Sequence, residues 1–548
     1  MFGLMQERPL LVTSIIQHAA RHHGATEVVS RLLDGSLHRT TYSALERRAR
    51  RLVRALQRLG VKPEDRVATL AWNSFRHMEM YYGISGMGAI CHTVNPRLSP
   101  DDVAYILNDA GDSLLFADTS FTALIEAAAP KLSGHLRGVV MLCGPQEMPA
   151  VTLPAGIDLL CYETLMDGAD EDFAWPGFDE RTAANLCYTS GTTGRPKGVL
   201  YSHRSILLHT MAQNSAAVFG LKPRDRTMPV VPMFHVNGWG TAYSAPSMGA
   251  ALIMPGRHLD GASLATLMNE ERVIVSAGVP TVWLGLLQHL RASGERLHTV
   301  RRLVIGGSAC PPALIEAFDQ EYGITVEHAW GMTETSPLGT YNTPLTIAGE
   351  DEAAALRRKA RQGHAIFGID MRIVDDMGQE LPWDGATSGN LQVRGHWVCS
   401  SYYGQEPGSA NDADGWFTCG DVATISPEGN MEITDRSKDV IKSGGEWISS
   451  ILLENIAVAQ PDVAEAAVVA AAHPKWDERP LLIVVPKPGS TIDPAALLAA
   501  FRGQVASYWV PDAVVVVDGL PHTATGKISK LTLRKQYRNY LLEQQSAA

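Results

Sequence analysis

One stretch of the sequence is unusually rich in groups that can bind phosphate. It contains, in succession, Thr189, Ser190, Gly191, Thr192, Thr193, Gly194, Arg195, Pro196, Lys197 and Gly198. Glycines let backbone N–H groups turn toward an anion, while hydroxyls donate to phosphate oxygens and cations offset their charge. An apolar, strand-like segment over 183–188 leads into this run. The density of these groups favours a phosphate-binding loop over a structural turn.

The loop differs from the Walker A loop of P-loop kinases and GTPases. In that loop a lysine directly follows the second glycine and precedes Ser or Thr. Lys197 instead follows Pro196 and precedes Gly198. The spacing therefore disfavours a kinase or GTPase of that type.

A second candidate site is the run Trp330-Gly331-Met332-Thr333-Glu334-Thr335. An indole offers a flat face to adenine, and hydroxyl and carboxylate oxygens suit Mg²⁺ on ATP. Taken alone, a Thr-Glu pair more often begins a helix. Gly306-Gly307-Ser308-Ala309 poses a similar choice, because in isolation it is more simply a strand-to-helix turn capped by Ser308.

Together these segments resemble one known family. Residues 188–198 are similar to the signature loop of the adenylate-forming superfamily, which includes acyl-CoA synthetases, peptide-synthetase adenylation domains and firefly luciferase. Residues 330–334 resemble its Tyr-Gly-x-Thr-Glu segment, with Trp330 at the tyrosine position. Residues 416–421 resemble its Trp-Phe-x-Thr-Gly-Asp segment, with Cys419 at the threonine position. Residues 435–447 and 521–527 resemble its hinge region and its C-terminal Pro-x-x-x-x-Gly-Lys segment.

The resemblance implies a nucleotide site. Its members would be Thr189, Ser190, Gly191, Thr192, Thr193, Gly194, Lys197, Gly307, Ser308, His328, Ala329, Trp330, Gly331, Thr333, Asp421, Arg436, Lys438, Lys442 and Trp447. Asp421 and Arg436 would hold the ribose, and Lys438 would be the pivot of the hinge. The catalytic residues would be Lys527, Glu334, Thr189 and His235. Glu334 and Thr189 would also hold Mg²⁺.

The same resemblance places the acyl group and CoA. The acyl pocket would be lined by His235, Val236, Trp239 and Gly307. Trp239 matches the tryptophan that gates the acyl tunnel in bacterial fatty acyl-CoA synthetases, although a core tryptophan is the simpler alternative. Trp283 would belong to the pocket wall. The loop on the CoA side would comprise Gly444, Gly445 and Glu446.

The resemblance implies an ATP-dependent, AMP-forming acyl-CoA synthetase that works through an acyl adenylate. ATP, CoA and a small carboxylic acid would be its substrates, Mg²⁺ its cofactor, and a homodimer its state by analogy. The expected acid is a medium- to long-chain fatty acid. The alternative is a short acid such as 3-methylthiopropionate.

Three other functions share parts of this pattern. A carrier-protein-loading adenylation enzyme would normally be followed by a carrier domain with a Ser attachment site, which this sequence does not contain. A luciferase-like oxygenase shares every motif, and only assays of light or oxygen uptake separate it. A non-catalytic nucleotide-binding regulator would not need Lys527 together with Glu334, Asp421 and Arg436.

The elements that must position these residues follow an α/β pattern. Apolar positions predict helices over 40–59 and 78–87, and short apolar runs predict strands over 66–72, 113–116, 138–142, 273–277 and 302–305. This alternation indicates a large N-terminal domain of layered α/β sheets, largely parallel. Later strands over 366–374, 389–394 and 430–434, separated by turn residues, predict a small β-barrel-like part.

The last part of the chain predicts a separate, small and mobile α+β domain. Its helices are expected over 451–459, 494–502 and 528–541, and its strands over 466–471, 481–485 and 513–517. We therefore expect an AMP-binding domain over 1–434, a hinge over 435–438 and a lid domain over 439–548.

Composition excludes several other classes of protein. The 548 residues exceed what one compact core accommodates, and a net charge of −11 without a basic face argues against a nucleic-acid partner. The seven cysteines are scattered without a C-x-x-C pair, which predicts neither a zinc site nor a disulfide framework. No apolar run is long enough to span a membrane, and no secretory signal is recognisable, so we expect a cytoplasmic protein.

Overall fold

Seven strands form the first sheet of the computed structural model, which describes residues 1, 3–189, 195–343, 345, 347, 349–444, 446–522 and 528–547. Their order is β7-β6-β5-β3-β4-β8-β9, and the pairs are parallel except for β8 with β9. The strands are β3 (Arg66–Leu70), β4 (Ile90–Thr93), β5 (Leu114–Ala117), β6 (Gly138–Met141), β7 (Asp158–Cys161), β8 (Ala183–Tyr188) and β9 (Gly198–Ser202). The antiparallel β8–β9 pair encloses the predicted phosphate loop.

A nine-stranded sheet follows, in the order β16-β15-β14-β13-β12-β10-β11-β1-β2. Its strands are β1 (Glu27–Arg31), β2 (Leu37–Thr41), β10 (Arg226–Pro229), β11 (Ala251–Met254), β12 (Val275–Gly278), β13 (Arg302–Ile305), β14 (Thr325–Gly331), β15 (Leu338–Tyr341) and β16 (His364–Ala365). The strands from β11 to β14 are parallel. Their apolar sequences reflect burial by helices on the sheet.

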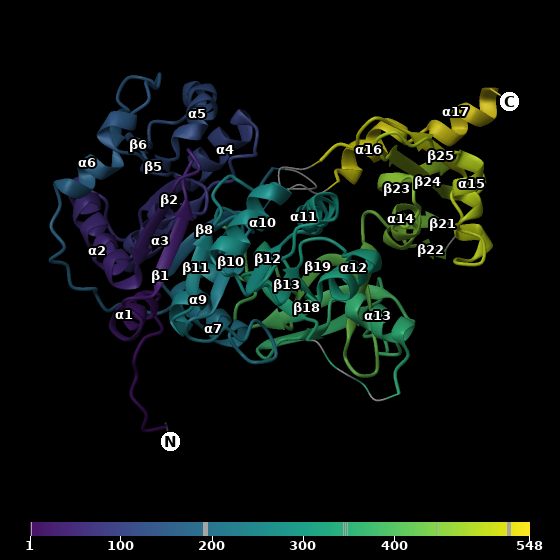
Figure 1. The fold of residues 1–548 in the computed structure, drawn as a ribbon, viewed down its shortest axis with the longest axis horizontal. Coiled ribbons are helices and arrows are strands. Elements are labelled where there is room, and N and C mark those ends of the chain that lie inside the picture. The colour runs from purple at the N-terminus through teal and green to yellow at the C-terminus, as the bar shows by residue number, and fades with distance from the viewer. Residues whose placement is uncertain are drawn as a thin grey trace.

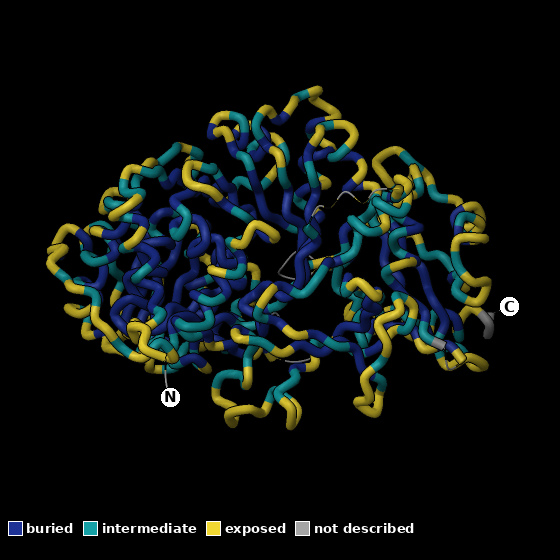
Figure 2. The backbone as a smooth tube through the Cα atoms, turned by 90° about the horizontal axis from the view of Figure 1, so that it is seen from below, coloured by how far each residue is buried: buried dark blue, intermediate teal, exposed yellow. Residues whose placement is uncertain are grey.

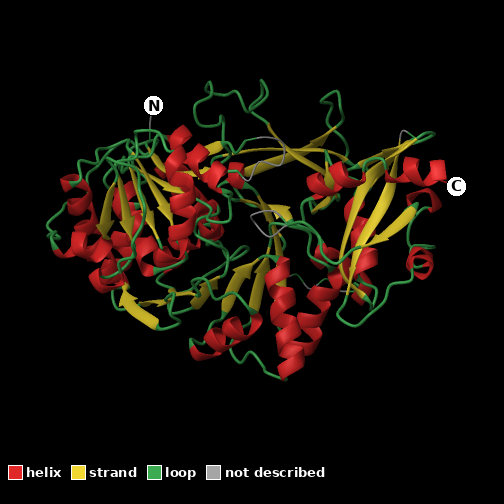
Figure 3. Ribbon diagram, turned by 90° about the horizontal axis from the view of Figure 1, so that it is seen from above, coloured by secondary structure: helices red, strands yellow, loops and turns green. Residues whose placement is uncertain are grey.

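Helices pack around these two sheets, as the red ribbons of Figure 3 show. They are α1 (Thr13–His22), α2 (Tyr42–Arg58), α3 (Phe75–Gly86), α4 (Pro100–Ala110), α5 (Thr122–Ala128), α6 (Tyr162–Asp167), α7 (His203–Gln213), α8 (Val236–Trp239), α9 (Thr241–Met248), α10 (Gly261–Glu270), α11 (Pro280–Ser293), α12 (Pro312–Tyr322) and α13 (Glu352–Ala360). In α2 the buried residues include Leu45, Leu52, Val53 and Leu56, which is the stripe that a 3.6-residue period predicts. Short 3-10 turns complete this part: η1 (Thr119–Phe121), η2 (Ala129–Lys131), η3 (Pro145–Glu147) and η4 (Thr333–Thr335).

The part expected to be barrel-like is a four-stranded antiparallel sheet. It consists of β17 (Ile369–Val374), β18 (Gly389–Gly395), β19 (Phe417–Ile425) and β20 (Met431–Arg436). The strand predicted over 366–374 was too long, because the chain turns at Gly368, whose φ is +106°, before β17 begins. β19 and β20 carry Asp421 and Arg436 at paired positions.

The smaller C-terminal domain lies at one end of the molecule, coloured green to yellow in Figure 1. Its sheet contains β21 (Ile441–Ser443), β22 (Glu446–Ile448), β23 (Val463–His473) and β24 (Asp477–Pro486), which pair antiparallel, and β25 (Ala513–Val516), which pairs parallel to β24. Its helices are α14 (Ser450–Val458), α15 (Pro494–Ala499), η5 (Ser507–Trp509), α16 (Lys530–Tyr537) and α17 (Tyr540–Ala547). The fold is thus the predicted α/β class with a large N-terminal and a small C-terminal domain.

The prediction of a single helix over 528–541 was wrong. The chain instead forms α16 and α17, and the carbonyl of Arg538 between them accepts the N–H of Ala472 from β23. That bond to the sheet diverts a carbonyl from helical pairing. A break of this kind depends on a tertiary contact and leaves no signal in the local sequence.

Buried residues, dark blue in Figure 2, continue through the sheets of both parts of the molecule. The seven cysteines all lie among the described residues and are free. Within the part of the chain that the structure describes, no helix combines the length and apolar character needed to cross a membrane.

Candidate active site

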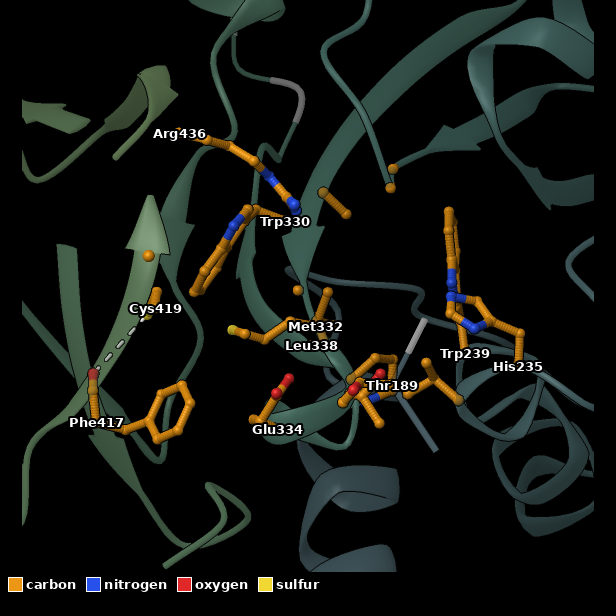
Figure 4. Close-up of a pocket in the computed structure, with 18 of the residues that line it drawn as sticks. Thr189, His235, Trp239, Trp330, Met332, Glu334, Leu338, Phe417, Cys419 and Arg436 are labelled. Carbon is orange, nitrogen blue, oxygen red and sulfur yellow. Dashed lines mark hydrogen bonds between the residues drawn. The ribbon is translucent and has the colours of Figure 1, made fainter. Parts of the chain in front are cut away.

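A cavity of about 500 Å³ opens where the sheets of the N-terminal part meet the start of the C-terminal domain. It is lined by thirteen residues that the sequence predicted: Thr189, Lys197, Gly307, Ala329, Trp330, Gly331, Thr333, Glu334, Arg436, Lys438, His235, Val236 and Trp239. Figure 4 shows His235 and Trp239 on one side and Trp330 with Arg436 on the other, with Glu334 and Thr189 between them. Residues far apart in the chain therefore converge on one space.

The two ends of the predicted phosphate loop are held together at the cavity. Thr189 follows β8, and its N–H donates to the carbonyl of Lys197 at 2.9 Å. In return the N–H of Lys197 donates to Thr189 Oγ1 at 3.2 Å. Lys197 Nζ lies 4.7 Å from the centre of the Tyr402 ring, a cation–π distance. Ser190, Gly191, Thr192, Thr193 and Gly194 lie outside the described residues.

Glu334 is the buried carboxylate of the cavity. It lies in η4 with 7% of its surface exposed, and Tyr402 Oη donates to its Oε1 at 2.8 Å. Burial raises the pKa of Glu334, against the opposing effects of Tyr402, Arg436 and Lys197. A buried carboxylate with oxygen lone pairs beside the Thr189 hydroxyl is a donor set suited to Mg²⁺.

Trp330 and Asp421 are joined directly. The indole Nε1–H donates to Asp421 Oδ2 at 2.9 Å, and Arg436 Nε lies 3.5 Å from Asp421 Oδ1. Trp330 also fits against Gly339, since a Cβ at that glycine would lie 2.4 Å from the indole Cζ3. The tryptophan thus provides a hydrogen-bond donor to the carboxylate that was predicted to hold a ribose.

Residues of the predicted hinge form one edge of the cavity. Arg436, Ser437 and Lys438 all line it. Burial lowers the pKa of Lys438, and the positive charge of Arg436 lowers it further. Cations at this edge are placed to meet the charge of a nucleotide.

The apolar end of the cavity is formed around Trp239. Gln213, Phe219, Val236, Val304 and Gly306 also line the cavity. The indole covers Gly306, because a Cβ there would lie 3.0 Å from Trp239 Cη2. His235 lies beside Trp239 (Figure 4).

Several predicted residues do not line the cavity. The side chain of His328 is buried and bonds through Nδ1 to the carbonyl of Ala360 at 2.8 Å. Ser308 is exposed, and the following helix α12 is preceded by Pro311, so Ser308 is not its cap either. Trp283 was expected in the pocket wall but is fully buried in the core beside Gly278.

Two residues predicted for the nucleotide site, Lys442 and Trp447, lie with the predicted CoA-side loop in the C-terminal domain and do not line the cavity. Lys442 and Trp447 pair across β21 and β22, with Lys442 Nζ 5.4 Å from the indole centre. Gly444 donates its N–H to the carbonyl of Trp476 at 3.0 Å, and Glu446 begins β22. Gly445 and Lys527 lie outside the described residues.

The sequence did not single out Tyr402, Gln213 or Phe219, which also line the cavity. Tyr402 contacts both Glu334 and Lys197. Its place in the chain, just before Tyr403, carries no spacing that suggests chemistry, so only the folded structure brings it to the site.

Comparison with known proteins identifies the family. A family model described as AMP-binding enzyme matches residues 16–403, and one described as AMP-binding enzyme C-terminal domain matches residues 452–527. The chain belongs to the AMP-binding enzyme family. Within it the chain is an AMP-forming acyl-CoA ligase, an acid–thiol ligase, because relatives at 44–50% identity over almost their whole length are CoA ligases.

The relatives of this ligase differ in the acid they are named for. The 3-methylmercaptopropionyl-CoA ligase of Ruegeria lacuscaerulensis is 50% identical, over 99% of this chain and 100% of the relative. The medium-chain-fatty-acid–CoA ligase of Ectopseudomonas oleovorans is 47% identical over 100% of both. The long-chain-fatty-acid–CoA ligase of Thermus thermophilus is 44% identical, over 98% of this chain and 97% of the relative.

Solved structures agree with the fold of the ligase. The anthranilate CoA ligase AuaEII in complex with anthranoyl-AMP has a TM-score of 0.86 at 25% identity, covering 97% of this chain and 99% of that one. ATP-bound MatB of Rhodopseudomonas palustris has a TM-score of 0.80 at 26% identity, covering 96% and 99%.

Proposed function

We propose that this ligase activates aliphatic carboxylic acids of short to medium length, including thioether acids such as 3-methylmercaptopropionate, which is the same acid as 3-methylthiopropionate. The observation that carries this proposal is the position of Trp239, whose indole lines the cavity and lies against Gly306. A short acyl group fits in front of the indole, whereas a long chain requires the indole to move. Relatives named for a thioether acid and for medium-chain acids support this range.

In the first half-reaction a carboxylate oxygen attacks the α-phosphorus of ATP, and pyrophosphate leaves. Two anions must meet, so the site has to work by positioning and by neutralising charge. Lys197 and Arg436 supply cations at the cavity, and Trp330 and Asp421 form the bonded pair that would receive the nucleotide. We place Lys527 with them as the adenylation lysine on the strength of the family resemblance.

Mg²⁺ is the metal that the donor set fits. Glu334 and the hydroxyl of Thr189 would hold it, and Tyr402 would keep the carboxylate oriented through its bond to Oε1. The ion would withdraw charge from the phosphate oxygens of ATP.

In the second half-reaction the thiol of CoA attacks the acyl carbonyl, and AMP leaves with the anhydride oxygen. Gly444 of the predicted CoA-side loop does not line the cavity in this arrangement, and neither do Lys442 and Trp447, which were predicted for the nucleotide site. We therefore infer that the C-terminal domain turns at 435–438, as hinge motions do, to present this loop. The domain boundaries at 434 and 439, a homodimer and a cytoplasmic location belong to the same proposal.

Pyrophosphate release, measured across a panel of acids, tests the function. The panel contains straight-chain acids from butyric to palmitic acid, 3-methylthiopropionic acid and benzoic acid. We expect the highest kcat/KM among the short to medium and thioether acids, each with AMP formed in the same amount as acyl-CoA. A preference for benzoic or palmitic acid would overturn the proposed substrate range, and a folded protein that forms no AMP with any acid would overturn the activity.

A further inference from the structure

We propose that Gln213 is the latch that holds Trp239 in its closed position, so that breaking this latch lets longer acyl chains enter. Gln213 would act through Trp239, without touching the reacting atoms, and is therefore a positioning residue. The proposal rests on the proposed function, because it concerns the length of the acid that the cavity accepts.

The contact between the two residues is short and buried. Gln213, the last residue of α7, is 1% exposed and lines the cavity. Its Nε2–H donates to the backbone carbonyl of Trp239 at 2.7 Å. This bond fixes which end of the amide faces the tryptophan, since the reverse orientation would bring two acceptors together.

The segment that carries Trp239 has an unusual backbone. Five consecutive residues have positive φ angles: Val236 at 45°, Asn237 at 55°, Gly238 at 58°, Trp239 at 54° and Gly240 at 75°. For residues other than glycine, and for β-branched Val236 above all, this conformation is costly. Such strain persists only where neighbouring groups hold the chain in place.

The two ends of this left-handed turn are held by different parts of the molecule. At the start, Tyr81 Oη donates to the carbonyl of Met233 at 2.5 Å and to Asn237 Oδ1 at 3.3 Å. At the end, Gln213 reaches across from α7 to Trp239. Thr241 Oγ1 also donates to the carbonyl of Gly238 at 2.7 Å, so loss of the Gln213 bond loosens the carbonyl of Trp239 while the rest of the turn stays anchored.

The side-chain amide of Gln213 can form a different hydrogen bond when its bond to Trp239 is lost. Gln213 Oε1 is buried and has no hydrogen-bond partner among the described residues. Nearby, the N–H of Leu338 donates to His209 Nε2 at 3.3 Å, which leaves the ring proton on Nδ1. Burial lowers the pKa of His209 to about 3, so the ring stays neutral.

His209 and Gln213 are one helical turn apart on α7, a spacing at which side chains meet. Both approach Gly240 closely: a Cβ there would lie 2.7 Å from Gln213 Oε1 and 3.1 Å from His209 Nδ1. When the turn releases, the amide oxygen can accept the Nδ1–H of His209. The amide of Gln213 thus has one partner in each state: the Trp239 carbonyl when the turn is held, and the Nδ1–H of His209 when the turn is released.

The test compares chain-length profiles of Gln213→Met and Gln213→Glu with that of the wild type. Methionine keeps the bulk without the amide, and glutamate keeps the shape but cannot donate to the Trp239 carbonyl when it is ionised. We expect kcat/KM for lauric acid, relative to butyric acid, to rise about tenfold in both variants, the change that one hydrogen bond produces. The KM for ATP should stay within about twofold, a margin below that tenfold effect.

Two controls separate the latch from a general loss of structure. Gln17→Met removes an amide that also donates to a backbone carbonyl, that of Thr13, on α1 away from the cavity, and should leave the profile unchanged. In a Trp239→Ala background, Gln213→Met should have no further effect on the lauric-to-butyric ratio, because the gate it holds is gone.

Each result decides one question. The latch is overturned if both Gln213 variants show the wild-type ratio of kcat/KM for lauric acid to that for butyric acid. It is also overturned if Gln213→Met changes this ratio equally with and without Trp239. A wild-type protein that activates none of the straight-chain acids would instead overturn the proposed function. A shift in the ratio that disappears in the Trp239→Ala background supports the latch.

Discussion

At the level of single residues, Glu334 combines two conflicting properties. It is buried, which disfavours its charged form, yet its proposed task of holding Mg²⁺ requires that charge. Tyr402, Arg436 and Lys197 offset part of the cost. A bound cation would therefore stabilise the charged form of Glu334 more than the surrounding protein does. A charged group held at such a cost is typical of functional sites.

The first prediction concerns Glu334→Gln. Because the pKa of Glu334 is raised in the folded state, the folded protein binds more protons than the unfolded chain between the two pKa values, and its stability falls as pH rises through that window. The amide variant should therefore melt at a higher temperature than wild type at neutral pH without ligand. The difference should shrink as pH falls through the window, and acyl-adenylate formation should drop about 10²- to 10³-fold.

Thermal scans at several pH values, paired with pyrophosphate release, check this prediction. A variant that melts below wild type at every pH would show that the charge of Glu334 stabilises the fold, contrary to our argument.

Trp330 offers a second prediction at this scale. Trp330→Phe keeps an aromatic face but removes the donor to Asp421 Oδ2, leaving a buried carboxylate oxygen without that partner. A hydrogen bond to a charged group is worth about 1.5–3 kcal/mol, so the KM for ATP should rise about tenfold or more. Steady-state kinetics with ATP and the acid varied separately measure this effect.

Trp397→Phe is the matched control for Trp330→Phe. Trp397 is also buried and also donates its indole N–H, to the carbonyl of Leu338, but it does not line the cavity. If both variants raise the KM for ATP equally, the effect of Trp330 comes from packing and not from its bond to Asp421.

At the level of elements, the left-handed turn α8 determines the shape of the cavity around Trp239. The element places a bulky indole against Gly306, and Gly240 at its end gives the space in which Gln213 and His209 approach. A right-handed helix over the same residues would direct Trp239 elsewhere. The local geometry is therefore the basis of the substrate range that we propose, which is shorter than the medium- to long-chain range expected from the sequence.

Gly240→Ala tests this element. The substitution adds a Cβ that would lie 2.7 Å from Gln213 Oε1, at a residue whose φ of +75° already disfavours alanine. Gly294→Ala is the matched control, since its φ is +73° and no atom of the described residues lies within 4 Å of its Cβ position. We expect the control to lose about 1 kcal/mol and Gly240→Ala to lose clearly more.

Denaturant unfolding of the two glycine variants compares these losses. Equal destabilisation would mean that the close approach of Gln213 to Gly240 imposes no constraint, and the strain would then lie in the backbone alone.

At the level of the whole molecule, the two domains are joined by a buried polar network. Asp435, the first residue of the proposed hinge, accepts from Ser450 N at 2.6 Å and from Ser450 Oγ at 2.7 Å. Lys530 Nζ donates to the same hydroxyl at 2.6 Å and lies 2.7 Å from Glu454. The proposed turn of the C-terminal domain at Lys438 would break the bonds between Asp435 and Ser450.

We therefore predict that Asp435→Asn shifts the balance between the two half-reactions. The amide of the variant weakens the hydrogen bonds to Ser450, at the start of α14. These bonds hold the present arrangement, in which the CoA-side loop does not line the cavity. The rate of thioester formation relative to adenylation should rise about tenfold, as expected for one charged hydrogen bond weakened. Single-turnover assays of each half-reaction measure the ratio, and an unchanged ratio would exclude this network as a brake on domain rotation.

Lys527→Ala gives the complementary prediction. Acyl-adenylate formation should slow about 10²- to 10³-fold, because a charge aimed at the transition state is lost, while preformed acyl adenylate should still react with CoA. Equal damage to both half-reactions would argue against two domain arrangements with separate tasks.

The sequence by itself determined the α/β class, most helices and strands, and a site around the phosphate loop, because turn glycines, apolar periodicity and charged groups at fixed spacing are local signals. Its resemblance to the adenylate-forming superfamily implied one site for Glu334, Trp330 and Trp239, and the cavity contains all three. The sequence did not indicate that Tyr402 and Gln213 line the cavity, nor that Trp239 lines it while Trp283 lies in the core. These positions depend on how the elements pack.

Tertiary structure alone decided three further features. Trp330 donates to Asp421 because β14 and β19 come together, and the C-terminal helix breaks at Arg538 because β23 takes its carbonyl. The closed position of Trp239 follows from a left-handed turn held between Tyr81 and Gln213. Each depends on contacts between segments that are distant in the chain. Such contacts form only when their free energy outweighs the conformational entropy lost by ordering both segments.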